Sequence, residues 1–110
     1  MPQISSPSEA FEVVASQFDA KRAQGVVGTV QLEVSGEGGG MWAVEIADGT
    51  YRLIEGGVDV PTTTLRMNRE DFLGIVNGTL KVMDAFLQGR LVLQGDMDLA
   101  LKFQSIFGLS

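Results

Sequence analysis

Residues 81–107, KVMDAFLQGRLVLQGDMDLALKFQSIF, decide the fold of this chain. At 81–88 the apolar residues recur at helical spacing, and the glycine that follows ends that segment. The short apolar run at 91–93 is typical of a buried strand. Asp96 is a good helix N-cap residue, and a run of apolar residues follows it. The stretch therefore predicts a helix, a strand and a last helix, in that order.

The two predicted helices carry more apolar surface than a single core contact requires. In the helix at 81–88 the apolar side chains are expected to point inward: Val82, Met83, Phe86 and Leu87. The last helix has apolar residues around most of its circumference, and Met67, Met83 and Met97 add flexible thioethers to this half of the chain. From composition, a thick core, a dimer face and a ligand cavity all agree with this surplus.

A strand and a helix are predicted directly before this stretch. Pro61 introduces the β-branched residues of 62–67, which favour a strand. Asn68 is a good N-cap, and Glu70 and Asp71 are interpreted as first-turn acids that the helix dipole favours. Apolar residues at helical spacing fill the helix up to its stop at Asn77-Gly78: Phe72, Leu73, Ile75 and Val76.

The middle of the chain predicts three strands joined by short turns. Apolar and polar residues alternate in 26–35 and again in 41–47, with a glycine-rich turn at 36–40 between them. Asp48-Gly49 is a strong signal for a two-residue hairpin, and 50–55 forms the third strand. Short turns between consecutive strands imply an antiparallel meander with one solvated face.

The N-terminal part predicts a helix that covers a core. Ser6 and Glu9 form a capping box. Behind it, one apolar stripe follows at helical spacing: Phe11, Val14, Ala15 and Phe18.

Length and composition restrict the class of protein. With 110 residues, the chain is expected to form one domain, residues 1–110, with one core. It contains no cysteine and no histidine, which excludes disulfides, thiolate or imidazole metal sites and histidine-dependent catalysis. A formal net charge of −6 has the wrong sign for a nucleic-acid-binding protein. Residues 33–59 contain six acidic residues and a single basic one, Arg52, which indicates a solvated acidic sheet face.

Motifs for nucleotide or metal binding are missing or misplaced. The glycines of 36–40 join two strands instead of opening a helix, so they predict no nucleotide site. Asp96 and Asp98 have the spacing of a metal clamp, but we interpret them as an N-cap and a first-turn acid. We therefore expect no cofactor, no metal and no catalytic residue.

The sequence also predicts a cytoplasmic location. The longest uncharged run, Ala23–Leu32, is far shorter than a membrane-spanning helix. The first residues lack a basic start followed by an apolar stretch, so no signal peptide is expected. Phe107-Gly108-Leu109-Ser110 is not a peroxisomal address of the S-K-L type.

Three segments of the chain resemble the sterol carrier protein type 2 domain family. They are Glu70-Asp71-Phe72 followed by Asn77-Gly78, then Ala85-Phe86-Leu87-Gln88-Gly89-Arg90-Leu91, then Gln94-Gly95-Asp96-Met97-Asp98-Leu99-Ala100-Leu101-Lys102. They match the family's E-D-F helix start, its A-F-x-x-G-K/R-L segment and its G-D/N-x-x-L-A-x-K/Q helix start, in order and spacing. The Trp42 strand, the Asp48-Gly49 hairpin and Gly56-Gly57 match as well. The resemblance covers about residue 8 to the end.

The resemblance implies an α/β (α+β) fold with a five-stranded, mostly antiparallel sheet, helices packed on one face and a hydrophobic tunnel between them. The tunnel residues that it implies are Phe72, Val76, Met83, Phe86, Leu99, Phe103 and Phe107, with Trp42 and Leu101 as further candidates. For each phenylalanine, ordinary core packing is the competing interpretation. Gln104 falls near a family position that meets the polar end of the ligand, and plain helix surface is its alternative.

The leading hypothesis is a small lipid-binding carrier without catalytic activity. Its implied partner is a hydrophobic small molecule (a fatty acid, acyl-CoA, sterol or phospholipid), with transient membrane contact, no nucleic acid, and a monomeric or homodimeric state. The alternative is a non-catalytic accessory or dimerisation module with a filled core. A lipid-modifying enzyme is disfavoured because the chain lacks histidine and cysteine. The family's peroxisomal signal is absent, so we do not carry over the transfer role of the animal proteins.

Overall fold

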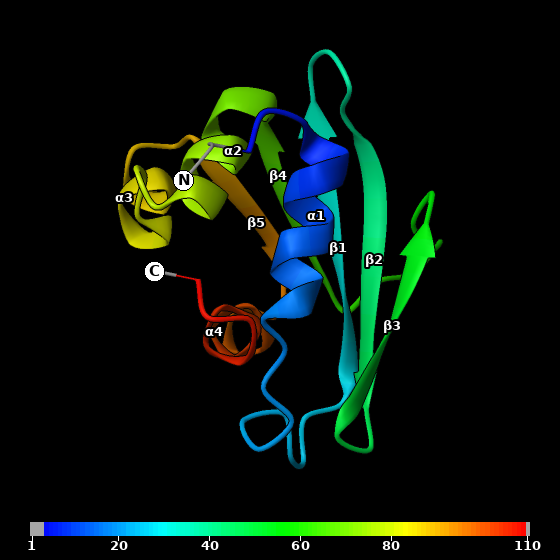
Figure 1. The fold of residues 1–110 in the computed structure, drawn as a ribbon. Coiled ribbons are helices and arrows are strands. Elements are labelled where there is room, and N and C mark those ends of the chain that lie inside the picture. Colours follow the sequence, from blue (N-terminus) through cyan, green and yellow to red (C-terminus); the bar gives the residue numbers. More distant parts are fainter. Residues whose placement is uncertain (1–3, 110) are drawn as a thin grey trace.

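The computed structural model describes residues 4–109, which form a sheet with helices on one of its faces (Figure 1). The elements in chain order are α1 (Pro7–Ser16), β1 (Gly28–Ser35), β2 (Gly40–Ala47), β3 (Thr50–Glu55), β4 (Thr63–Asn68), α2 (Arg69–Asn77), α3 (Val82–Leu87), β5 (Leu91–Gly95) and α4 (Met97–Ile106).

The sheet has five strands in the order β3-β2-β1-β4-β5. Strands β1, β2 and β3 form the expected antiparallel meander, and the hairpin at Asp48-Gly49 is confirmed by positive φ angles of 53° and 73°. β4 pairs in parallel with β1, and β5 pairs antiparallel with β4. The strand predicted at 91–93 is therefore confirmed, and it joins the sheet beside β4.

The predicted helix caps are present. Ser6 Oγ accepts a hydrogen bond from the Glu9 N–H (3.2 Å), which closes the first turn of α1. Asn68 Oδ1 accepts one from the Asp71 N–H (2.8 Å) at the start of α2. At α4, Asp96 Oδ1 accepts from the N–H groups of Asp98 and Leu99. Because these caps satisfy backbone donors that helices leave unpaired, they set where each helix begins.

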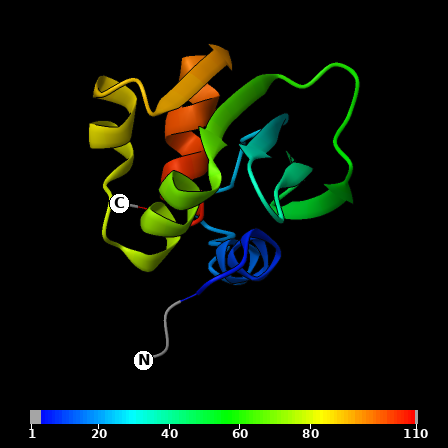
Figure 2. The same cartoon turned by 90° about the horizontal axis from the view of Figure 1, so that it is seen from above.

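The segment 56–62 crosses the sheet face opposite the helices on its way from β3 to β4. The Val58 N–H donates to Gln31 Oε1 (2.7 Å), so the crossing segment covers Gln31, which is only 5% exposed. Gly57 is required here, since a Cβ at this position would lie 2.5 Å from Gln31 Oε1. Figure 2, which looks at the molecule from above, shows this long connection beyond the sheet and the helices on the other side.

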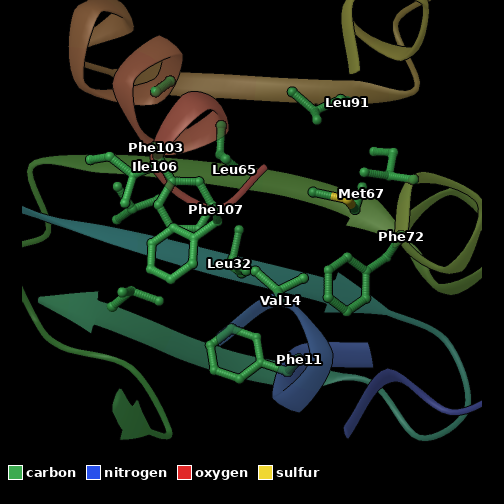
Figure 3. Packing of buried hydrophobic residues seen from close by; sticks show 14 of the residues in the cluster. Phe11, Val14, Leu32, Leu65, Met67, Phe72, Leu91, Phe103, Ile106 and Phe107 are labelled. Atoms are coloured by element: carbon green, nitrogen blue, oxygen red, sulfur yellow. The ribbon is translucent and has the colours of Figure 1, made fainter. Parts of the chain in front are cut away.

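The core lies between the sheet and the helices (Figure 3). At one end, the rings of Phe11 and Trp42 stack with centroids 5.2 Å apart. At the other end, Phe107 packs between Phe18 (5.4 Å) and Phe103 (4.7 Å). The first contact holds α1 against β2, and the second group joins the segment after α1 to the end of α4.

Some element boundaries and one side-chain orientation differ from the predictions. β1 begins at Gly28 instead of residue 26, and β4 covers 63–68 instead of 62–67, because Asn68 is both the last strand residue and the cap of α2. Leu87 was expected to point inward but is 74% exposed. In the short helix α3 Ala85 is the buried residue, and a residue two positions further along a helix points to nearly the opposite side.

Candidate functional site

A cavity of about 80 Å³ lies between the sheet and the helices α2, α3 and α4. Nearly all of its wall is apolar. The wall residues are Val14, Leu32, Leu65, Met67, Phe72, Ile75, Val82, Met83, Phe86, Leu91, Leu93, Met97, Ala100, Leu101, Phe103, Gln104 and Leu109. The chain thus encloses a space suited to an apolar ligand.

Three adjacent strands supply the floor of the cavity. Leu32 of β1 lies opposite Leu65 of β4, and Leu65 lies opposite Leu93 of β5. Met67 and Leu91 form the next pair two residues along, on the same side of the sheet. The alternation of side chains in β4 and β5 therefore presents a continuous apolar surface to the helices.

The helices supply the walls, and their degree of burial differs. Phe72 on α2 and Phe103 on α4 are 3% and 1% exposed, so they belong to both the core and the cavity wall. In α3 only Ala85 is buried, although Met83 and Phe86 both border the cavity. This short helix is the most weakly embedded part of the wall.

Four wall residues are also exposed to solvent, and they mark the mouth of the cavity. Met83 and Phe86 on α3 are 50% and 36% exposed. Met97 and Leu101 on α4 are 49% and 50% exposed. The cavity is partly open, and these exposed wall side chains place its opening between α3 and α4. Both helices contact β5 (Figure 1).

Gln104 brings the one polar side chain to the wall among the residues that the structure describes. Its amide has no hydrogen-bond partner within residues 4–109, whereas its backbone oxygen accepts from the Leu109 N–H (2.9 Å). None of the wall residues among 4–109 has an ionisable side chain. Such a site offers a hydrogen bond to a polar group and apolar contact to a chain, but no acid or base for catalysis.

The eight residues predicted for the tunnel fall into three groups. Phe72, Met83, Phe86, Phe103 and Gln104 border the cavity, as does the further candidate Leu101. Val76 and Phe107 instead border a neighbouring hollow between α1, α2 and the end of α4. Leu99 borders neither.

Leu99 and Trp42 have packing roles away from the cavity. A Cβ at Gly28 would lie 2.7 Å from Leu99 Cδ2, so Leu99 fills the space beside the first residue of β1. Trp42 stacks on Phe11 of α1. Leu99 lies one helical turn before Phe103. It therefore packs beside the start of β1, whereas Phe103 borders the cavity.

The residues predicted for the tunnel leave out the strands of the floor, five further wall residues on the helices and Leu109. The five helix residues are Val14, Ile75, Val82, Met97 and Ala100. The signal for the floor was present, because Leu65 and Met67, like Leu91 and Leu93, alternate at strand spacing. Leu109 had no such signal. It follows the last helix, and only the packed structure brings it back to the wall.

Ionisable groups form pairs outside the cavity. Asp71 on α2 is buried, and its Oδ1 accepts a hydrogen bond from Arg90 Nε (2.9 Å). Arg90 is the residue directly before β5. On the opposite face of the sheet, Arg66 donates to Glu33 (2.8 Å) and Gln31 adds a second hydrogen bond, and both lower the pKa of Glu33. Both pairs hold structure and neither faces the cavity.

Metal sites and membrane-spanning helices are absent from the described residues. In residues 4–109 no three side chains of the metal-binding types gather closely enough to hold an ion. Within the same range, every helix is too short or too polar to cross a bilayer.

The fold and the cavity agree with comparisons to known proteins. Residues 9–108 match the model of the SCP-2 sterol transfer family, so the chain belongs to that family. It is similar to the palmitated sterol carrier protein 2-like 2 of Aedes aegypti, solved by NMR. The two chains are 29% identical with a TM-score of 0.79, and the match covers 93% of this chain and 94% of the other.

The chain also resembles parts of longer proteins. It is 34% identical over 113 residues to hydroxysteroid dehydrogenase-like protein 2 of Xenopus tropicalis, a match that covers 96% of this chain and 26% of that protein. The chain thus spans about a quarter of the length of this curated relative. The fold recurs in the sec-alkylsulfatase Pisa1 from Pseudomonas, with 20% identity and a TM-score of 0.76, over 92% of this chain and 16% of that one.

Proposed function

We propose that residues 1–110 act as a lipid-binding unit that holds a fatty acid, acyl-CoA, sterol or similar lipid and catalyses no reaction. The observation that carries this proposal is a wall of apolar side chains with a single polar one, open between α3 and α4. Each methylene removed from water contributes about 0.8 kcal/mol, so an acyl chain binds such a wall without specific polar contacts. The palmitated relative from Aedes aegypti supports an acyl chain as the ligand.

Gln104 is our candidate for contact with the polar end of the lipid. Its amide is unpaired within residues 4–109 and borders the cavity on the same helix as Leu101, which stands at the mouth. A carboxylate or ester at the mouth would accept a hydrogen bond from this amide while the chain points inward. Burial of the chain then provides most of the affinity, and Gln104 provides the orientation.

The apolar rim of the mouth, formed by Met83, Phe86 and Leu87 on α3, is suited to lipid uptake from a membrane surface. Leu87, 74% exposed, follows Phe86 on α3, and Met83 on the same helix is half exposed. Exposed apolar side chains that are grouped on a surface are typical of an interaction site. We expect Leu87→Ser to reduce cosedimentation with phosphatidylcholine vesicles. Val60→Ser, which removes an 89% exposed apolar side chain from the segment 56–62, is the matched control.

The second candidate is an accessory module of a larger protein. The low coverage of the hydroxysteroid dehydrogenase-like relative favours it, since there a domain like this one is part of a longer chain. In that case the apolar rim would contact protein, and the cavity would be a packing defect. Lipid binding by the isolated chain distinguishes the two candidates.

The decisive experiment is native mass spectrometry of the purified chain, followed by calorimetric titration with palmitate. We expect a co-purified lipid as added mass and saturable one-to-one binding after its removal. Gln104→Leu should weaken palmitate binding while binding of the methyl ester changes less, because the ester carries no charge. If a folded wild-type chain takes up neither palmitate, palmitoyl-CoA nor cholesterol at micromolar concentration, the accessory-module candidate is correct.

A further inference from the structure

A second hollow adjoins the cavity, and none of the four mouth residues borders it. Its volume is about 230 Å³, and it lies between α1, α2 and the end of α4. Its wall residues are Val13, Val14, Gln17, Ile75, Val76, Phe107, Gly78, Gly108 and Leu109. The hollow and the cavity share three of their wall residues, namely Val14, Ile75 and Leu109. These three side chains are the partition between the two spaces.

Leu109 is the member of this partition that is least embedded. Val14 and Ile75 are 3% and 6% exposed and belong to the helices α1 and α2. Leu109 is only partly buried and lies beyond α4, after Gly108, whose φ of 65° reverses the chain. Two hydrogen bonds hold this turn, Gly108 N–H to Ser105 O (3.2 Å) and Leu109 N–H to Gln104 O (2.9 Å). A glycine in this conformation commonly ends a helix, and the apolar residue after it packs back on the last turn.

The volume of the cavity shows why the second space matters. An apolar cavity of about 150 Å³ holds a benzene molecule, and this cavity measures about 80 Å³. A long acyl chain therefore needs room beyond the cavity. The adjoining hollow offers that room: Val13, Val76 and Phe107 give it apolar wall, while Gln17 makes part of the wall polar.

We propose that the second hollow is a subsite for the methyl end of a long, unbranched acyl chain, and that Leu109 determines how much of the chain enters. This inference rests on the proposed function, in which the cavity binds the part of the lipid nearest the mouth. Each methylene that passes the partition and leaves water completely adds up to roughly fourfold to the affinity. Affinity should rise with chain length until the partition stops further entry.

Chain-length profiles test the subsite. We would measure the affinity for decanoate, myristate, palmitate, stearate and arachidate by calorimetry, using wild type, Leu109→Ala and Leu109→Phe. Removing the side chain should raise the affinity for stearate and arachidate by about fourfold or more, with little change for decanoate. The larger phenylalanine should move the optimum to shorter acids. Leu101→Ala, at the mouth, is the matched control and should weaken all five acids alike.

A spectroscopic measurement on wild type keeps the test independent of the variants' folding. Stearate with a nitroxide at its methyl end should broaden the amide signals of Val76 and Gly78. Broadening confined to α3 would overturn the subsite, as would one length profile shared by all variants. If wild type binds none of the five acids, the proposed function fails and the subsite with it. If wild type binds the acids and Leu109→Ala shows the same chain-length profile as wild type, only the subsite fails and the proposed function stands.

Discussion

Asp71 and Arg90 join α2 to the beginning of β5 through a buried carboxylate. The Asp71 side chain is 5% exposed, that of Arg90 is 45% exposed, and Arg90 Nε lies 2.9 Å from Asp71 Oδ1. The N–H of Arg90 also donates to the backbone oxygen of Ala85 (2.9 Å), which closes the end of α3. Arg90 thus connects three elements around the cavity, because it contacts α2 and α3 and directly precedes β5.

Removing Arg90 should destabilise the protein strongly. Arg90→Ala leaves the Asp71 carboxylate buried without its partner, and we expect a loss of about 3 kcal/mol in the free energy of unfolding. Arg66→Ala breaks the more exposed pair with Glu33 and should cost below about 1 kcal/mol. Urea denaturation of both variants checks this difference. Equal losses in the free energy of unfolding would mean that burial of the Asp71 carboxylate does not make its pair with Arg90 more important for stability.

The Glu33–Arg66 pair should make stability depend on pH. The hydrogen bond from Arg66 and that from Gln31 lower the pKa of Glu33 in the folded chain. This contribution is fully present above the unfolded-state pKa and is lost as the pH falls through the lowered folded-state pKa. The difference in unfolding free energy between wild type and Arg66→Gln should therefore shrink on acidification. A difference that stays constant from neutral to acidic pH would contradict the assignment.

Truncation of Phe86 should act mainly on lipid binding, and truncation of Phe107 mainly on stability. Phe86 stands at the mouth and is 36% exposed, so Phe86→Ala should cost roughly 1 kcal/mol of stability and weaken palmitate binding clearly. Phe107 is 1% exposed and packs on Phe18 and Phe103, so Phe107→Ala should cost about 3–5 kcal/mol. Thermal unfolding and calorimetric titration measure the two quantities. Leu87→Ala, next to Phe86 but outside the wall, should change neither by much.

Gly28 and Leu99 should show coupled effects. Gly28→Ala would place its Cβ 2.7 Å from Leu99 Cδ2, and overpacking of this kind costs about 1–3 kcal/mol. Leu99→Ala alone leaves a space and should also destabilise the chain. The double variant should be more stable than the sum of the two losses predicts, since the added methyl group enters the vacated space. Strict additivity in a double-mutant cycle would show that the two residues do not compete for one space.

Local sequence signals predicted the elements well, for physical reasons. Ser6, Asn68 and Asp96 act on backbone groups within three residues, so the start of each helix depends on its own neighbourhood. Asp48-Gly49 supplies the backbone conformation that a tight hairpin needs. The family motif implied a five-stranded, mostly antiparallel sheet, but no signal predicted that β1 and β4 pair in parallel, because β2 and β3 lie between them in the sequence.

The candidate site was predicted only in part. The family resemblance implied Leu99, Phe103 and Phe107 as tunnel residues, but they span a greater length along α4 and its end than the cavity does. Leu99 reaches the start of β1 and Phe107 reaches Phe18, while Phe103 lies between them and borders the cavity. Periodicity identifies the side of a helix that is covered, whereas the position of each neighbour along the helix depends on the packing of other elements.

The sequence by itself determined which segments become helices and strands, and it determined that their shared interior is apolar with no histidine or cysteine in it. Only the tertiary structure decided that Asp71 is buried, that Leu87 faces solvent and that Leu109 lies between the cavity and the second hollow. Capping and alternation act between neighbours in the chain, so they can be read from a few residues. Burial and enclosure depend on which distant elements meet, and that is settled only when α2, α3, α4 and β5 pack together.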